Sequence, residues 1–199
     1  MPAGKLHFMY AAMNAGKSTL LLQMAHNYRE MGMQVMIWSS DQHEVNESGE
    51  LFVESRIGLR EPANVYHKDT PIRDMIKEAH SQSELNAVFV DEAQFLTPDQ
   101  AWELALVADD LNLPVYTFGL RTDFQGHLFE GSATLLAISD VIQEVKTICH
   151  CGRPATMTAR RDAEGNFVRT GEQISIAKSD YVSLCRSHWL QSIEREAAN

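Results

Sequence analysis

The stretch from Tyr10 to Thr19 ends in Gly16-Lys17-Ser18, the core of a phosphate-binding loop. It follows a short apolar run and precedes a run with helical spacing, and strand, tight loop, helix is the context that such a loop needs. Loop N–H groups and the N-terminus of the following helix together favour an anion. Lys17 would reach the β- and γ-phosphates, and the Ser18 hydroxyl would take a Mg²⁺ coordination position.

The loop departs from the full pattern G-x-x-x-x-G-K-[ST], because Ala11 stands where the pattern has its first glycine. Ala11 must therefore avoid a positive φ or tolerate it at a cost of about 1–2 kcal/mol. The alternative interpretation is a helix N-terminus that carries Gly-Lys-Ser by chance.

An acidic pair, Asp91-Glu92, ends an apolar run that we expect to be a strand. Ligands of α/β sheets lie at the carboxyl ends of strands, so Asp91 would face the metal held by Ser18, directly or through water. A carboxylate at Glu92 could accept the proton of an attacking hydroxyl or water. The alternative is a pair of solvated charges at a strand end.

Gln94 and Phe95 extend from the same corner, and an amide followed by an aromatic ring suits a pocket for a planar ligand. The alternative for Phe95 is simple core packing. Arg121 follows the next strand and is a candidate for binding the γ-phosphate or charge on the leaving group, against the alternative of a surface ion pair with Asp123. Phe124 would form a second wall for a ring.

The three cysteines fall into a C-x-C pair, Cys149 and Cys151, and a C-x-x-H pair, Cys185 and His188. Three Cys and one His complete a tetrahedral set that is closed to water, which predicts a structural zinc site. Such an ion would contribute folding energy to a part of the chain too small for its own core. His150 is a competing ligand, and the alternative is a group of buried, unreactive thiols.

Strand and helix signals alternate through most of the chain, which predicts an α/β fold with a parallel sheet covered by helices on both faces. The domain division that we expect is 1–146 for nucleotide binding and 147–199 for a β-rich, zinc-binding part, with alternating stretches at 155–160 and 167–170. Residues 39–63 lack periodicity and predict a long functional or mobile loop. The expected strands are 5–10, 34–38, 85–90, 114–118 and 141–145; the expected helices run from the phosphate loop to about residue 31, from 71, over 98–110 and over 135–139.

The composition excludes several classes of function. The 199 residues contain no run of eighteen apolar residues and no secretory signal, so we expect neither a membrane span nor export. Three cysteines argue against a disulfide framework and for the cytoplasm. Residues 1–145 hold 9 Lys/Arg and 21 Asp/Glu, a balance of −12, whereas 146–199 hold 8 and 6, or +2. An acidic body makes general binding of nucleic acid unfavourable.

Taken in this order, the motifs resemble the cellular-type (type II) thymidine kinases over nearly the whole chain. The stretches that carry the resemblance are Ala12-Met13-Asn14-Ala15-Gly16-Lys17-Ser18-Thr19, Ser55-Arg56-Ile57-Gly58-Leu59, Asp91-Glu92-Ala93-Gln94-Phe95, Phe118-Gly119-Leu120-Arg121-Thr122-Asp123-Phe124, the zinc set, and Gly171-Glu172-Gln173 with Tyr181-Val182-Ser183-Leu184-Cys185.

The resemblance implies phosphoryl transfer from ATP to the 5′-hydroxyl of thymidine or deoxyuridine. It also implies a RecA-like sheet, a zinc-bearing domain with a lasso loop over the nucleoside, a homotetramer, and inhibition by dTTP. Glu92 would be the general base and Asp91 would act at Mg²⁺. The ATP-binding residues would be Ala11, Ala12, Met13, Asn14, Ala15, Gly16, Lys17, Ser18, Thr19, Asp91, Gln94 and Arg121. The nucleoside-binding residues would be Met13, Phe95, Leu120, Phe124, Thr158, Ile174, Ser175, Ile176 and Tyr181.

Two features depart from the family's pattern. His43 stands where Asp-x-Arg would place an arginine near phosphate, and Ala177 and Lys178 replace two glycines of the lasso. If those glycines permit close approach of the backbone to the base, this lasso takes a different path. Two other functions stay open from the residues alone: a regulatory ATPase with a zinc-bearing partner surface, and, less favoured by the charge, a zinc-ribbon nucleic-acid binder.

Overall fold

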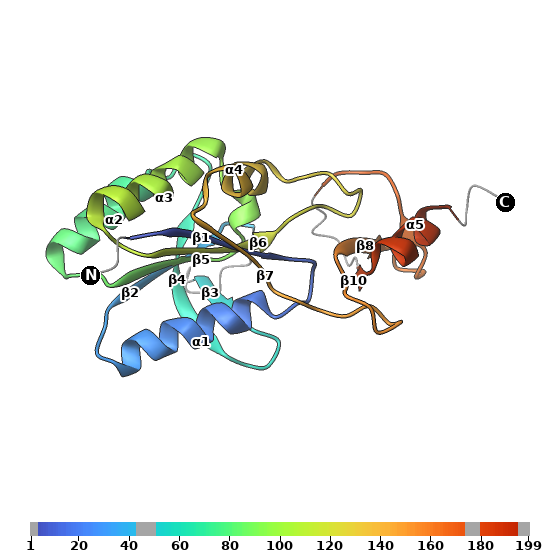
Figure 1. Ribbon diagram of the computed structural model, residues 1–199, viewed down its shortest axis with the longest axis horizontal. Helices are drawn as coiled ribbons and strands as arrows, with labels where there is room; N and C mark the ends of the chain where they lie inside the picture. Colours follow the sequence, from blue (N-terminus) through green and yellow to red (C-terminus); the bar gives the residue numbers. More distant parts are fainter. Residues whose placement is uncertain (1–3, 43–50, 174–179, 195–199) are drawn as a thin grey trace.

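The computed structural model describes residues 4–42, 51–173 and 180–194. A seven-stranded sheet in the order β3-β4-β2-β5-β6-β1-β7 forms most of the protein, and a three-stranded sheet in the order β10-β8-β9 follows it in the chain (Figure 1). The elements of the larger sheet and its cover are β1 (Leu6–Ala11), α1 (Lys17–Glu30), β2 (Val35–Ser40), β3 (Leu51–Glu54), β4 (Arg60–Tyr66), α2 (Ile72–Gln82), β5 (Ala87–Val90), the 3₁₀ turn η1 (Ala93–Phe95), α3 (Pro98–Leu111), β6 (Val115–Leu120), α4 (Glu130–Ile138) and β7 (Val141–Glu144).

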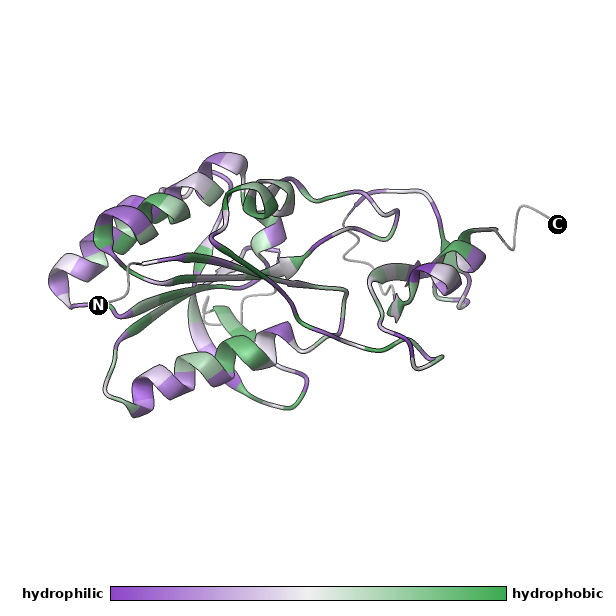
Figure 2. Cartoon of the chain, viewed as in Figure 1, coloured by the Kyte–Doolittle hydropathy of each residue, from purple (hydrophilic) through white to green (hydrophobic). Residues whose placement is uncertain are grey.

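Helices cover both faces of the large sheet, with α1 on one face and α2, α3 and α4 on the other (Figure 1). Successive side chains of β1 point to opposite faces of the sheet and so enter two separate core clusters. Phe8 packs in the cluster with α2 and α3, and Met9 packs in the cluster with α1. The strands of this sheet are mostly hydrophobic, whereas the helices carry both kinds of residue (Figure 2). This confirms the predicted α/β fold with a helix-covered, mainly parallel sheet.

The prediction of a loop over residues 39–63 was wrong at 39–40, 51–54 and 60–63, which form strands. Residues 43–50 lie outside the described residues. β3 and β4 form an antiparallel hairpin within this region, and β4 also pairs in parallel with β2, placing Ser40 opposite Tyr66. The segment lacks a regular apolar alternation and contains Pro62, so its local signal is weak. Hydrogen bonding to neighbours and burial of Leu51, Val53 and Tyr66 override that local preference.

The prediction for α4, the last of the helices that cover the large sheet, was too short. Residues 135–139 were expected as a helix, but α4 begins at Glu130 and ends at Ile138. Gly131 and Ser132 lie in its first turn and weakened the local signal. Gly131 is required there by packing, since an added Cβ would lie 2.6 Å from the Leu96 carbonyl oxygen.

The C-terminal part has its own sheet and its own apolar cluster. The sheet comprises β8 (Met157–Arg161), β9 (Phe167–Val168) and β10 (Asp180–Leu184), and it precedes α5 (Arg186–Glu194). Cys149, Ala155, Ala159, Leu184 and Cys185 are buried together beside it. The division at residues 146 and 147 remains a prediction. Within the described ranges, no helix has the length and apolar character to cross a membrane.

Candidate active site

The phosphate-binding loop connects the end of β1 to the start of α1. Its positive φ angles fall on Asn14 (60°) and Gly16 (84°), while Ala11 keeps an ordinary negative φ as the last residue of β1. An added Cβ at Gly16 would meet nothing within 4 Å, so the backbone conformation and not space favours glycine here. The missing first glycine of the motif is thus accommodated without strain at Ala11.

A cavity of about 360 Å³ lies over this loop. The predicted ATP-binding residues Met13, Asn14, Ala15, Gly16, Lys17, Ser18 and Thr19 line it, with Glu92, Leu120 and the hairpin residues Glu54, Ser55, Arg56 and Ile57. Arg56 therefore brings a second cation to the phosphate-loop cavity beside Lys17. The sequence quoted this stretch as part of the resemblance, but nothing local to it indicated that the hairpin turn reaches the loop.

Ser18 and Asp91 meet at the carboxyl ends of β1 and β5. The Ser18 hydroxyl donates to Asp91 Oδ2 at 2.9 Å, and Asp91 is 3% exposed. Burial and the neighbouring Glu92 raise the pKa of Asp91 to about 6, although Ser18 and Lys17 oppose this. Burial also lowers the pKa of Lys17, whose ammonium donates to the Ala12 carbonyl at 3.3 Å. A hydroxyl and a carboxylate so placed fit a magnesium ion, which takes oxygen ligands.

Glu92 has a left-handed backbone conformation (φ 53°, ψ 33°), which is uncommon outside glycine. Two contacts hold its main chain: Tyr66 Oη donates to its carbonyl at 2.8 Å, and its N–H donates to Asp91 Oδ1 at 3.0 Å. Gln94 Nε2 donates to its carboxylate, while Gln94 Oε1 accepts the Leu120 N–H at 3.0 Å. The carboxylate of Glu92 is therefore oriented by a side chain that is itself held by β6.

A second cavity, of about 200 Å³, adjoins the first. Six of the predicted nucleoside-binding residues line it: Met13, Phe95, Leu120, Phe124, Thr158 and Tyr181. Phe95 meets the ring of Phe129 edge to face, with centroids 5.9 Å apart, so it both packs and lines the cavity. Ile174, Ser175, Ile176, Ala177 and Lys178 lie outside the described residues. Met13, Glu92 and Leu120 line both cavities, so the two spaces meet beside the Glu92 carboxylate.

Two predicted ATP-binding side chains lie away from the phosphate loop. Gln94 lines the second cavity and not the phosphate-loop cavity. The Arg121 guanidinium donates to the Thr156 carbonyl at 3.1 Å and lies 5.4 Å from the Tyr10 ring centroid. The alternative ion pair with Asp123 is not formed either: Asp123 Oδ1 accepts the backbone N–H groups of Gln125 and His127.

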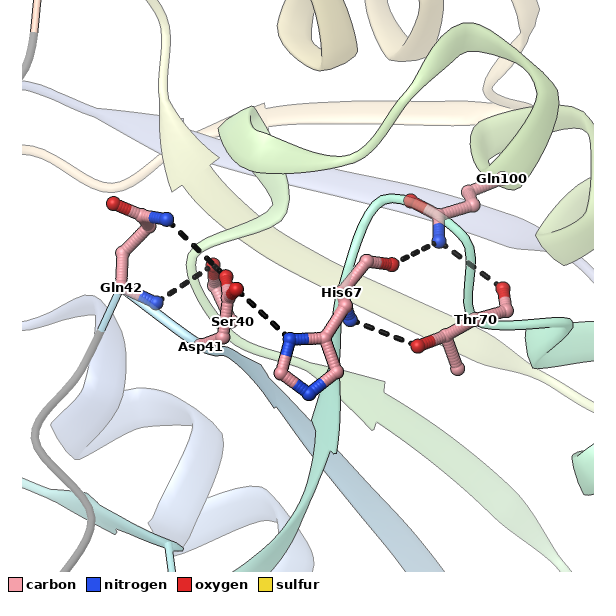
Figure 3. Close-up of polar contacts among 6 residues, drawn as sticks. All are labelled: Ser40, Asp41, Gln42, His67, Thr70 and Gln100. Carbon is pink, nitrogen blue, oxygen red and sulfur yellow. Dashed lines mark hydrogen bonds and ion pairs between the residues drawn. The ribbon is translucent and has the colours of Figure 1, made fainter.

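The end of β2 contributes a residue that the sequence analysis missed. Gln42 lines the second cavity, and it is linked to Asp41 by its side-chain amide at 3.2 Å (Figure 3). Asp41 in turn pairs with His67 at 2.9 Å, and Gln100 of α3 donates to the His67 carbonyl at 2.7 Å. The rule that ligands lie beyond the carboxyl ends of strands could have indicated Gln42. His43 lies outside the described residues.

The four predicted zinc ligands come together. The ligand atoms of Cys149, Cys151, Cys185 and His188 all lie within 4.8 Å of one another. His188 Nδ1 is 3.4 Å from Cys149 Sγ and 3.5 Å from Cys185 Sγ, and the Sγ atoms of Cys151 and Cys185 are 3.9 Å apart. Ligands about 2.0–2.3 Å from one ion in a tetrahedron would be separated by roughly 3.5–3.8 Å, so this set fits zinc.

The thiol environment is consistent with that fit. Burial raises the pKa of the Cys149 thiol, but backbone N–H groups at Cys151 and Cys185 outweigh this and lower it to about 6. A thiolate is the form that ligates a metal. His150 Nδ1 also lies 3.6 Å from Cys149 Sγ, beside the set and not within it.

Comparison with known proteins gives a consistent result across the chain. Residues 4–189 match the family model described as thymidine kinase. A thymidine kinase of Mesorhizobium japonicum is 50% identical over 193 residues, covering 97% of this chain and 94% of the relative. One from Novosphingobium aromaticivorans is 52% identical over 190 residues, covering 95% and 98%. One from Ruegeria pomeroyi is 49% identical over 189 residues, covering 94% of each chain.

Proposed function

This chain belongs to the thymidine kinase family, and we propose that it transfers the γ-phosphoryl group of ATP to the 5′-hydroxyl of thymidine or deoxyuridine. One observation carries the proposal: a phosphate-loop cavity and an aromatic-lined cavity share Met13, Glu92 and Leu120. A donor in the first cavity and a nucleoside in the second would therefore face each other across the Glu92 carboxylate.

On this proposal, the loop amides, Lys17 and Arg56 hold the triphosphate and balance its charge. Ser18 and Asp91 would hold Mg²⁺, which supplies charge neutralisation at the phosphates when bound. Phe95 and Phe124 would flank the base, and the Gln94 amide would keep the Glu92 carboxylate directed toward the sugar. Positioning in this arrangement is the main source of rate acceleration.

The chemical step is an in-line displacement at the γ-phosphorus. The 5′-oxygen forms a bond to that phosphorus while the bond to the β,γ-bridging oxygen breaks, and ADP leaves. Glu92 takes the proton of the 5′-hydroxyl, so the products are dTMP (or dUMP), ADP and one released proton. Lys17, which lines the phosphate-loop cavity, would reach the β-phosphate of the departing ADP.

The Cys149, Cys151, Cys185 and His188 set would hold a structural zinc ion with no open position. Its role follows from position: β8 lies between two halves of the zinc set in the chain, and Thr158 Oγ1 of β8 accepts the Met13 N–H at 3.2 Å. Zinc would thereby stabilise the part of the protein that closes one side of the nucleoside cavity.

The proposal includes three broader expectations. We infer a homotetramer and feedback inhibition by dTTP from the family resemblance, and a cytoplasmic site of action where the zinc-binding thiols stay reduced. Light scattering tests the assembly, and initial rates with added dTTP test the inhibition. Because Ala177 and Lys178 replace glycines of the lasso, the selectivity for thymine over other bases should be measured separately, by initial rates with different nucleosides.

The decisive experiment measures ADP release with and without a panel of deoxynucleosides, for the natural protein and for Glu92→Gln. We expect thymidine to stimulate turnover, and Glu92→Gln to lower kcat by about 10²–10⁴ with little change in thymidine affinity. Glu84→Gln, an exposed carboxylate change, serves as the control. Near-normal turnover in Glu92→Gln would remove Glu92 from its role. ATP hydrolysis indifferent to every nucleoside would instead support a regulatory ATPase.

A further inference from the structure

Arg160 of β8 is buried, with 6% of its surface exposed, yet none of the described carboxylates forms an ion pair with it. Its guanidinium lies over the Phe124 ring, 3.9 Å from the centroid. In addition, Nη1 donates to the Glu172 carbonyl at 3.0 Å and Nη2 donates to the Thr170 carbonyl at 3.5 Å. Removing a cation from water is costly, so a burial of this kind calls for a reason.

The planar guanidinium is suited to this combination of contacts. Its face stacks on an aromatic ring while its edge donates hydrogen bonds in the same plane, which a lysine ammonium does not do. The backbone of the partner segment is shaped around it: Gly171 has a φ of 130°, and an added Cβ there would lie 2.8 Å from Arg160 Nη2. A side chain at position 171 would meet the guanidinium, and the positive φ favours glycine there independently.

The three partners of Arg160 belong to segments that line the aromatic-lined cavity. Phe124 lines the cavity directly, and Thr170 and Glu172 lie in the segment that ends at Gln173, which also lines it. The loop of Phe124 is attached to the same segment by two further bonds: Gln173 Nε2 donates to Asp123 Oδ2, and Gln125 Nε2 donates to the Arg169 carbonyl, both at 3.1 Å.

β8 also connects this wall to the phosphate loop. Thr158 and Arg160 are two residues apart on one strand, so their side chains share a face. Thr158 Oγ1 accepts the Met13 N–H at 3.2 Å, and Arg160 contacts Phe124 and the segment 170–173. One strand face thus contacts both the donor side and the acceptor side of the site.

We propose that Arg160 is a positioning residue for the nucleoside: it fixes Phe124 and residues 170–173 against each other and thereby sets the acceptor wall of the cavity. The proposal rests on the proposed function, because it assigns that cavity to the nucleoside. Arg160 itself does not line the cavity, so it acts through Phe124 and Gln173 and not by touching the substrate.

The test compares Arg160→Met, Arg160→Lys and a matched control, Arg161→Met. Arg161 is the next residue of β8, and it places its guanidinium over Phe167, 4.8 Å from a ring that does not line the cavity. We expect Arg160→Met to raise the KM for thymidine about tenfold, with the KM for ATP and kcat within about twofold of the natural protein. Arg160→Lys keeps the charge without the planar fork, so its KM for thymidine should lie between those of Arg160→Met and the natural protein.

Two more measurements keep the inference testable on its own. In a Phe124→Leu background, adding Arg160→Met should raise the KM for thymidine by much less than tenfold, because the ring through which Arg160 acts is gone. Hydrogen exchange of the unliganded proteins should be faster at residues 169–173 in Arg160→Met and unchanged in Arg161→Met. This exchange readout does not depend on any activity.

Three results would overturn the proposal: a thymidine KM within twofold of the natural value in Arg160→Met, an equal rise in the KM for ATP, or unchanged exchange at residues 169–173. Should Arg160→Met fail to fold, Arg160→Lys decides by the same three criteria. If the natural protein does not phosphorylate thymidine, the proposed function is refuted instead. The hydrogen-exchange comparison of Arg160→Met with Arg161→Met then decides whether Arg160 fixes residues 169–173.

Discussion

Replacing Asp91 by Asn should make the ligand-free protein progressively more stable, relative to the natural protein, as the pH rises, while removing most of its activity. Asn carries no charge and keeps one oxygen, which can accept either the Ser18 hydroxyl or the Glu92 N–H but not both. The lost hydrogen bond lowers the stability of the variant by an amount that does not change with pH. Burial and Glu92 raise the pKa of Asp91 from 3.8 to about 6. At about 1.4 kcal/mol per pKa unit, the ionised carboxylate costs about 3 kcal/mol of stability at pH values above 6.

The sign of this effect fixes its pH dependence. Because the folded-state pKa lies above the unfolded one, the cost is absent below about pH 4, grows between about pH 4 and 6, and is complete above that. The stability of Asp91→Asn relative to the natural protein should therefore rise by about 3 kcal/mol between pH 4 and pH 7.5, with roughly half of that rise reached at pH 5. Urea unfolding followed by circular dichroism, with a chelator and without nucleotide, measures both values.

The control is Asp69→Asn, which changes an exposed turn residue and should shift the unfolding free energy by less than about 0.5 kcal/mol. Phosphoryl transfer in Asp91→Asn should fall by roughly 10² or more, as expected when a charge at the phosphates is lost. If the stability of Asp91→Asn relative to the natural protein did not rise between pH 4 and pH 7.5, the burial of a costly charge at this corner would be refuted.

Two further predictions concern the metal and the helix that supports β4. Freshly purified, reduced protein should contain about one zinc per chain by elemental analysis. Removing the zinc should abolish thymidine phosphorylation, because β8 and Thr158 lose their support. A protein that is metal-free and fully active would contradict this. Thr97→Ala removes the capping box of α3 and should lower the unfolding free energy by about 1 kcal/mol with kcat unchanged. Gln100→Ala should lower the unfolding free energy further, because the carbonyls of His67 and Thr70 also lose a donor. Equal losses in these two variants, measured by urea unfolding, would show that those two carbonyl contacts contribute nothing.

The parts of the site that lie next to a strong local signal could be predicted from the sequence. Gly16, Lys17 and Ser18 follow an apolar run, and Asp91 ends another, so the carboxyl-end rule brings them to one edge of the sheet. The Ser18–Asp91 hydrogen bond confirms that they meet. The zinc set could be predicted for a similar reason, because ligand types and short spacings indicate a tetrahedral site without knowledge of the fold.

The parts that depend on pairing between distant segments could not be predicted. Arg60 to Tyr66 have no strand pattern of their own, yet β2 and β3 hold them as β4, and Tyr66 then reaches the Glu92 carbonyl. Arg160 likewise looks like an ordinary charged residue of a short strand. Its contacts with Phe124 and Glu172 exist only once three separated segments have folded together.

In the described residues, strained backbone conformations are concentrated at the proposed active site. Three residues other than glycine have a positive φ: Asn14, Glu92 and Asn112. Asn112 follows α3, where a left-handed residue is an ordinary way to end a helix. The other two border the phosphate-loop cavity, and Glu92 is the costlier case, because asparagine tolerates this conformation better than glutamate. Glycine would adopt the conformation of Glu92 without a steric cost. The hydroxyl of Tyr66, the carboxylate of Asp91 and the amide of Gln94 instead hold a glutamate in that conformation, which is what a precisely directed carboxylate at the junction of two cavities requires.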